Sequence, residues 1–172
     1  MKEIILQIPE GKKAKWINGV LTLVDDKPKD ITERIKTFED ACYELGDEHP
    51  LVIQYRLTSG AYKGDPMTED FIAYLKLRII CAALNEGWQP TFDNKESRYY
   101  PCFYIYTKPE YKKINEDEKK KYRDVDLVCY NVFRTASSSS FHLHARLALK
   151  TEELAVYCGR QFDDIWADFL IK

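Results

Sequence analysis

The 172-residue sequence has no apolar run close to the roughly 18 residues that a membrane-spanning helix needs. Its first residues also lack the small-residue cleavage site of a signal peptide, and Pro9 interrupts the apolar stretch early. We therefore expect neither a membrane partner nor a secretory leader.

The chain also lacks a strong charge of either sign. There are 26 Lys and Arg residues against 28 Asp and Glu residues, and the formal net charge is −2. This balance excludes a globally basic nucleic-acid-binding protein, although it is compatible with a local basic patch.

Paired cysteine motifs are missing as well. The five cysteines form an odd, widely spaced set with no Cys-x-x-Cys motif: Cys42, Cys81, Cys102, Cys129 and Cys158. A secreted disulfide framework normally shows paired spacing, whereas free cysteines in apolar stretches behave as small hydrophobic residues. We expect core thiols in a reducing compartment.

What is abundant is material for a packed core. Hydrophobic residues make up 45% of the chain and aromatic residues 13%. We expect one domain over residues 1–172, with an N-terminal β-hairpin region at 1–24. Asn18-Gly19 predicts its turn, because a two-residue hairpin turn of this type needs left-handed backbone at both positions. A charged segment at 108–124 is expected to be an exposed insertion.

Three helices are expected from apolar spacing and capping residues. The first lies within 31–45, where apolar residues recur at steps of three and four, and Thr37 with Asp40 offers an alternative start. The second begins after Thr68 and ends at Gly87, and its apolar residues cover more than half of its circumference, which indicates a buried central helix. The third begins after Thr151 and closes the chain.

The remaining apolar segments are expected to be extended. Residues 51–57 form a short strand or a linker, and 99–106, 125–134 and 140–149 form strands, the last two as a hairpin around a serine-rich loop. This order predicts an α+β fold: an antiparallel sheet built from hairpins, with about three helices packed on one face. No glycine-rich loop follows a predicted strand, which disfavours a doubly wound nucleotide-binding fold.

His142 and His144 are candidate metal ligands or catalytic residues. Residues two apart in a strand share one face, so both imidazoles would point the same way, as a metal site or a small hydrolase would require. No nearby residue supplies a third ligand, and the pair also suits the polar side of a half-buried strand. We expect no metal, no cofactor and no enzymatic activity.

Aromatic residues interleaved with basic ones are the second group of candidates. Trp16 follows three lysines in the first hairpin, and the later strand carries further aromatic and basic residues: Arg98, Tyr99, Tyr100, Tyr104 and Tyr106. Such a surface suits a protein partner, for which Tyr and Trp are common anchors. Single-stranded nucleic acid stacking on the rings is the alternative, disfavoured by the net charge.

Several segments resemble one known group of proteins. They are Ile-Pro-Glu-Gly at 8–11, Ile-Lys-Thr-Phe-Glu-Asp-Ala-Cys at 35–42, Leu-Asn-Glu-Gly-Trp-Gln-Pro at 84–90, Tyr-Tyr-Pro at 99–101 and Arg-Leu-Ala-Leu-Lys-Thr-Glu-Glu-Leu-Ala at 146–155. The group consists of small uncharacterised proteins frequent in gut Bacteroidetes and in their phages and prophages. The resemblance implies an accessory protein of phage or mobile-element origin in the cytoplasm of a bacterial cell, with association with a virion as an open alternative. It implies no activity. The expected function is therefore non-enzymatic binding of a protein partner, including a second copy of the chain, through an aromatic sheet face or hairpin edge.

Overall fold

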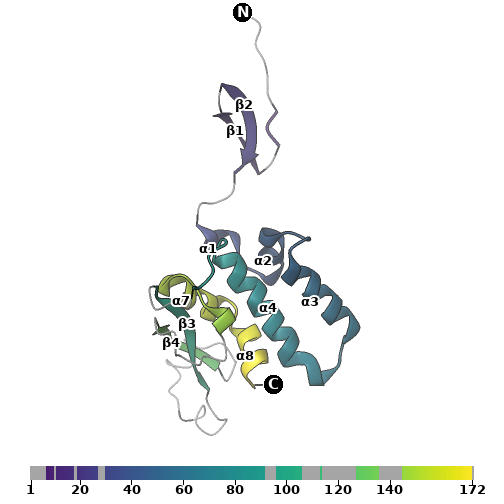
Figure 1. Cartoon of the computed structure of the whole chain (residues 1–172), viewed down its shortest axis with the longest axis vertical. Helices are drawn as coiled ribbons and strands as arrows, with labels where there is room; N and C mark the ends of the chain where they lie inside the picture. Colours follow the sequence, from purple (N-terminus) through teal and green to yellow (C-terminus); the bar gives the residue numbers. More distant parts are fainter. Residues whose placement is uncertain are drawn as a thin grey trace, which may run out of the picture.

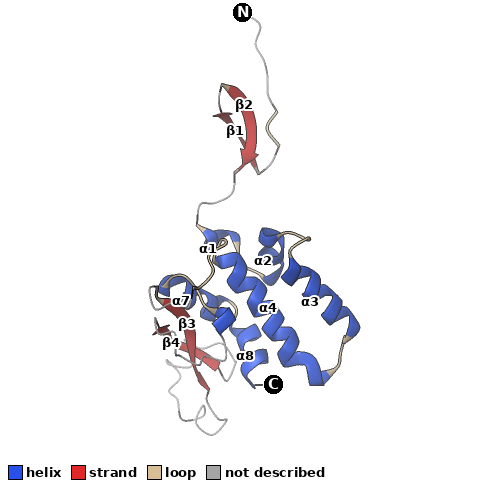
Figure 2. Ribbon diagram, in the orientation of Figure 1, coloured by secondary structure: helices blue, strands red, loops and turns tan. Residues whose placement is uncertain are grey.

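The chain adopts the expected α+β fold (Figures 1 and 2). The structure is a computed structural model that describes residues 7–9, 11–17, 19–26, 30–91, 96–105, 113, 127–135 and 145–171. In this part of the chain the strands form two separate two-stranded sheets, β1–β2 and β3–β4, rather than one larger sheet.

The first sheet is the predicted N-terminal hairpin. Strands β1 (Lys12–Ile17) and β2 (Val20–Asp25) run antiparallel, with Ile17 opposite Val20. Gly19 has φ +78°, the left-handed conformation that the Asn18-Gly19 pair predicts. Figure 1 shows this hairpin apart from the helical body.

The region predicted as one helix over 31–45 contains two. Helix α1 (Ile31–Arg34) ends at Ile35, whose backbone is extended, and α2 (Phe38–Leu45) begins after Thr37. The Thr37 hydroxyl accepts a hydrogen bond from Asp40 N at 3.1 Å, and Asp40 accepts one from Thr37 N at 2.9 Å. This reciprocal capping box confirms the alternative start at Thr37 and explains the break.

The expected strand or linker at 51–57 is instead part of helix α3 (Pro50–Ala61). Proline suits the first position of a helix, where its missing N–H has no partner to lose, and His49 caps the helix through Nδ1. A short apolar run does not by itself distinguish a strand from a helix, which is why the expectation was wrong.

Helix α4 (Glu69–Leu84) is the predicted central helix. It contacts α2 and α3 on one side and α8 on the other. A short 3-10 turn, η1 (Pro66–Thr68), precedes it, and Thr68 donates its hydroxyl to Asp65 O rather than capping the helix. Burial on several sides agrees with its apolar circumference; the buried residues are Ala73, Leu75, Leu77, Ile79, Ile80, Cys81, Ala83 and Leu84.

The second sheet pairs β3 (Arg98–Ile105) with β4 (Leu127–Thr135), antiparallel and with a bulge between Cys102 and Phe103. The expected partner of β4 was 140–149, but residues 145–147 form a 3-10 turn, η2, and Leu149 bridges Tyr99 instead. Helix α7 (Glu152–Gln161) packs on both strands and α8 (Asp163–Ile171) on β4. The single closing helix expected from Thr151 is therefore broken at Phe162, which has non-helical backbone.

Residues 106–112, 114–126 and 136–144 lie outside the described part of the chain. They include most of the charged segment expected at 108–124, of which the structure describes only Lys113, and the first part of the strand expected at 140–149.

Candidate protein-binding surface

The β1–β2 register brings four apolar residues to one side of the N-terminal hairpin. Trp16 lies opposite Leu21, and Ala14 lies opposite Leu23. Directly opposed residues of an antiparallel pair project from the same side of the sheet, and so do residues two apart in one strand. We call the side formed by Ala14, Trp16, Leu21 and Leu23 the hairpin face.

The hairpin face is exposed to solvent. Trp16 is 70% exposed, Leu23 42% and Leu21 36%. By contrast, Trp166 in α8 is only 3% exposed and packs against Phe103 of β3, with ring centroids 5.1 Å apart. Contiguous exposed apolar groups of this kind mark interaction sites more often than isolated ones do.

The opposite side of the hairpin carries basic residues. Lys13 and Lys15 lie opposite Val24 and Thr22. The Lys13 ammonium is 2.8 Å from Asp26 Oδ1, but both side chains are more than half exposed, so this ion pair contributes little stability. This side is not purely basic, because Ile17 lies opposite Val20 on it and both are exposed, at 42% and 64%.

The candidates predicted on β3 do not join this surface. Arg98 and Tyr100 are buried, at 2% and 8% exposure, and Tyr99 packs against the hydrophobic core. Burial raises the pKa of the Tyr100 hydroxyl above its ordinary value. Arg98 and Tyr100 are therefore in the interior and Tyr99 is partly buried, so the three do not form an exposed face. Figure 1 shows β3 apart from β1.

The other candidates fall outside the described part of the structure. These are Tyr106, His142 and His144, together with the side chain of Tyr104. Within the described residues, no group of three or more His, Cys, Asp or Glu residues could hold a metal ion. Likewise, no helix among them is long and apolar enough to cross a membrane.

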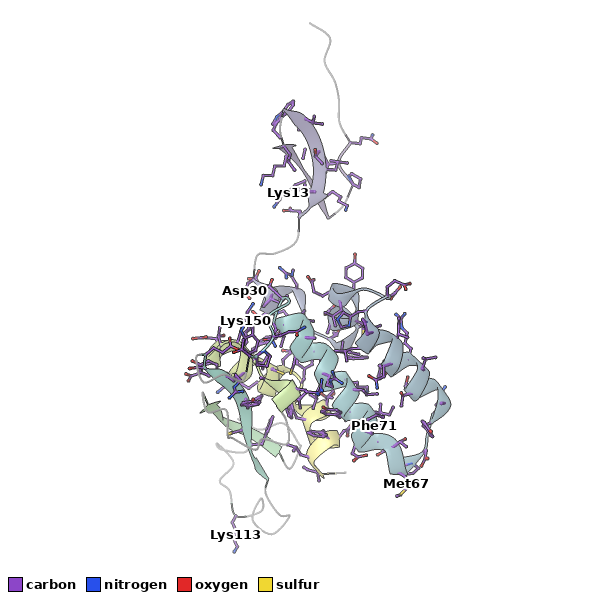
Figure 3. The ribbon with its side chains drawn as sticks, in the orientation of Figure 1. Lys13, Asp30, Met67, Phe71, Lys113 and Lys150 are labelled. Carbon is purple, nitrogen blue, oxygen red and sulfur yellow. The ribbon has the colours of Figure 1, made fainter. Side chains whose placement is uncertain are left out.

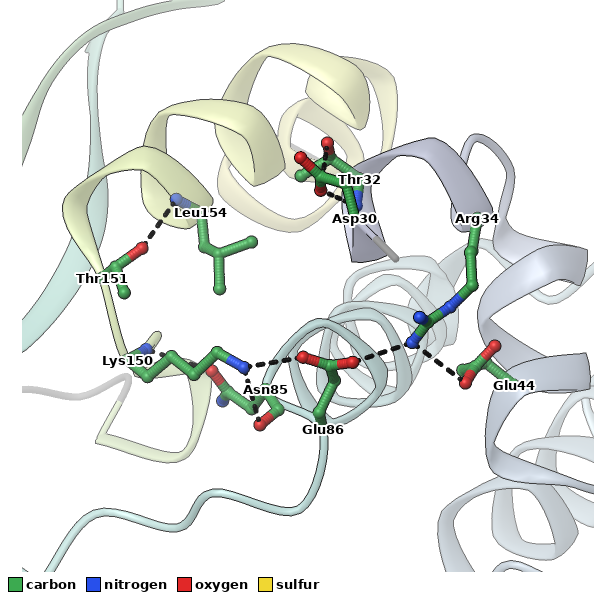
Figure 4. A network of polar contacts seen from close by, with 9 residues as sticks. All are labelled: Asp30, Thr32, Arg34, Glu44, Asn85, Glu86, Lys150, Thr151 and Leu154. Atoms are coloured by element: carbon green, nitrogen blue, oxygen red, sulfur yellow. Dashed lines mark hydrogen bonds and ion pairs between the residues drawn. The ribbon is translucent and has the colours of Figure 1, made fainter. Parts of the chain in front are cut away.

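A polar network at the C-terminal end of α4 joins four parts of the fold (Figure 4). Glu86 accepts hydrogen bonds from Arg34 Nη2 at 2.8 Å and from Lys150 Nζ at 3.0 Å, and Arg34 also reaches Glu44 at 3.3 Å. The bond from Lys150, followed by that from Arg34, lowers the pKa of the Glu86 carboxyl. The network therefore connects α1, α2, the residues just after α4 and residue 150.

Sequence reasoning identified Trp16 but missed Leu21 and Leu23 as parts of the same surface. The signal was present, because a two-residue turn at Asn18-Gly19 dictates that Trp16 lies opposite Leu21. What the pattern did not show is that the described residues leave this side exposed.

Comparison of the chain with protein-family models, with curated proteins and with solved structures finds no match. A functional assignment therefore depends on the residues and geometry described above.

Proposed function

We propose that this chain is a non-enzymatic interaction protein that binds a protein partner through the hairpin face. The observation that carries the proposal is the 70% exposure of Trp16 in a preset register beside Leu21 and Leu23. Tryptophan is strongly enriched among the residues that dominate binding energy at protein interfaces. Because the Trp16 side chain is mostly exposed, it contributes little to the stability of the fold, and binding a partner would account for it.

The hairpin itself also favours a partner. An isolated two-stranded hairpin is at best marginally stable in water, and a hydrophobic face normally needs a third strand or a helix against it. In the described part of the chain, neither β1 nor β2 pairs with a strand other than its hairpin partner. A surface that covers the hairpin face would supply the missing packing.

Charge indicates what such a partner looks like. The hairpin carries three lysines, Lys12, Lys13 and Lys15, against two aspartates, Asp25 and Asp26. The fitting partner surface is an apolar groove, for the hairpin face, with a carboxylate at its rim near Lys12, the one of the three lysines that lies on that side of the hairpin. A protein groove supplies both, whereas single-stranded nucleic acid would leave Leu21 and Leu23 without apolar contacts.

Cell location and origin belong to the same proposal. The free thiols of Cys42, Cys81, Cys102 and Cys158 support a reducing bacterial cytoplasm. The origin in a phage or mobile element rests on the segment resemblance alone.

Photocrosslinking at position 16 tests the proposal. Trp16 is replaced by p-benzoylphenylalanine in the cells that produce the protein, and the same substitution at Met67 is the control. Met67 is 87% exposed and lies at the other end of the molecule from the hairpin (Figure 3). We expect a protein adduct from position 16 and none from position 67.

The adduct is then reconstituted from purified components. The double substitution Leu21→Ser and Leu23→Ser should weaken binding at least about tenfold, because burying a leucine contributes about 1.5–3 kcal/mol. Leu57→Ser is the matched control, since Leu57 is 70% exposed on α3, and it should leave affinity unchanged.

An adduct of two identical chains would support the proposal with a second copy of the chain as the partner. Other outcomes overturn it. A nucleic-acid adduct with affinity that falls steeply with salt would favour the single-strand-binding alternative. No adduct at position 16, or equal loss with Leu57→Ser, would show that the hairpin face binds no protein partner.

A further inference from the structure

A cleft in the helical body differs in character from the hairpin face. It has a volume of about 610 Å³ and lies where the N-terminus of α3, the second half of α4 and residues 146–148 meet. Small-molecule sites usually measure about 300–1,000 Å³. Although the chain has 28 acidic residues, the described residues that line this cleft include no Asp or Glu, but they do include His49, Arg78 and Arg146.

The two arginines of the cleft have no carboxylate partner among the described residues. Arg34 and Arg56, by contrast, pair with Glu86 at 2.8 Å and with Asp47 at 2.6 Å. Arg78 is partly buried on α4, and its guanidinium carbon lies 6.0 Å from the centre of the Tyr74 ring. A partly buried charge without a counter-charge is unfavourable, and an anion in the cleft would compensate it.

The N-terminus of α3 adds a positive field. The first turn of this 12-residue helix contains no acidic residue, so no carboxylate within that turn offsets its dipole. His49 Nδ1 accepts the Leu51 N–H at 3.3 Å, which leaves the ring proton of the neutral imidazole on Nε2 as the remaining donor. Since Leu51 N–H is used in this way, side chains rather than the helix amides would hold an anion.

The walls of the cleft are fixed by bonds that need no ligand. Asn85 donates to Ala148 O at 2.8 Å and accepts from Lys150 N at 3.0 Å, so both ends of its amide brace the wall. The Trp88 indole N–H donates to Glu96 at 3.1 Å, which orients the ring. Apolar lining beside the arginines comes from Pro50, Leu51, Ala82, Trp88 and Pro90.

We propose that this cleft binds a small phosphate monoester whose ester group is a planar ring. Two guanidinium groups match the charge of a phosphate, about −1.5 to −2 at pH 7, better than the single charge of a carboxylate. The ring would pack on the apolar wall around Trp88. This assignment is independent of the hairpin face.

Titration with phenyl phosphate, followed by proton–nitrogen correlation spectra of the indole groups, tests the site. The Trp88 signal is identified by its loss in Trp88→Phe. We expect the Trp88 indole signal to shift and reach a plateau as phenyl phosphate is added, while the signal of the buried Trp166 does not move. Inorganic phosphate should compete for the site, and benzoate should bind at least about tenfold more weakly, because it carries one charge fewer.

Variants separate a built site from a weak surface effect. Arg78→Gln and Arg146→Gln should each raise the Kd at least about tenfold, the expected loss for a hydrogen bond between charged groups. Arg56→Gln, which removes an exposed arginine outside the cleft, should leave the Kd unchanged, and an unmoved Trp166 signal verifies that each variant is folded. No saturable Trp88 shift, equal binding of benzoate, or indifference to Arg78→Gln in the folded protein would each overturn the proposal.

Discussion

Asn85 joins the end of α4 to residues 148–150 by two side-chain hydrogen bonds, and its replacement tests how the fold is held together. Its Nδ2 donates to Ala148 O at 2.8 Å. Its Oδ1 accepts from Lys150 N at 3.0 Å (Figure 4). Asn85 is 5% exposed, so water does not readily replace either bond. The perturbation is Asn85→Ala, which removes both bonds and leaves the helix intact.

The expected loss follows from the two backbone groups left without partners. Ala148, whose carbonyl loses its donor, is 3% exposed, whereas Lys150 is only partly buried. A buried polar group without a partner costs about 1–3 kcal/mol, with the lower end applying to the N–H of Lys150. We expect Asn85→Ala to lower the free energy of unfolding by about 2–4 kcal/mol, which for a chain of this length corresponds to about 5–15 °C in Tm.

Urea unfolding followed by circular dichroism measures this loss. The midpoint should fall while the slope of free energy against urea stays constant, which shows that the compactness of the unfolded state has not changed. Gln161→Ala is the control: its amide donates to Lys36 O at 2.8 Å in an exposed setting, so we expect a loss below about 1 kcal/mol. If Asn85→Ala changed stability by less than about 0.5 kcal/mol, the reasoning from buried unpaired groups would be refuted.

Two further predictions concern the polar network and the capping box. Hydrogen bonds from Lys150 and then Arg34 lower the pKa of the Glu86 carboxyl in the folded protein. The ionised carboxylate therefore stabilises the fold above the unfolded pKa of about 4.3, and this stabilisation is lost as pH falls through the folded pKa. The difference in unfolding free energy between wild type and Glu86→Gln, measured by urea titration at several pH values, should therefore shrink below pH about 4, and a pH-independent difference would contradict this. Thr37→Ala should cost about 1 kcal/mol in the same assay and Thr37→Ser much less, because serine keeps the acceptor for Asp40 N; equal losses would argue against the cap.

The elements that could be predicted from the sequence are those that local chemistry decides. The Asn18-Gly19 turn sets the hairpin register, the Thr37 and Asp40 side chains start α2, and the apolar circumference of α4 places it centrally. In each case the determining residues are within a few positions of one another. Packing with distant parts of the chain is not needed to decide the outcome.

Elements decided by distant contacts were predicted poorly. The segment 51–57 is helical within α3, where Val52 is fully buried, and an apolar run of seven residues is compatible with either structure. Burial of Arg98 and Tyr100 depends on what lies over β3, which is helix α7, more than fifty residues later in the chain. Alternating aromatic residues show that a strand has two sides but not which side meets the core.

The free energy gained by burying the hairpin face can be compared with the cost of association. Complete burial of Trp16, Leu21 and Leu23 contributes about 1.5–3 kcal/mol for each residue. Association costs about 4–15 kcal/mol in lost translational and rotational freedom, so these three side chains alone would support a weak complex at most. The outer edges of β1 and β2 present backbone groups that no other strand pairs with in the described part of the chain. A partner that adds a strand along one of these edges while covering the hairpin face would gain both backbone hydrogen bonds and apolar burial, and it would also stabilise a hairpin that is marginal by itself.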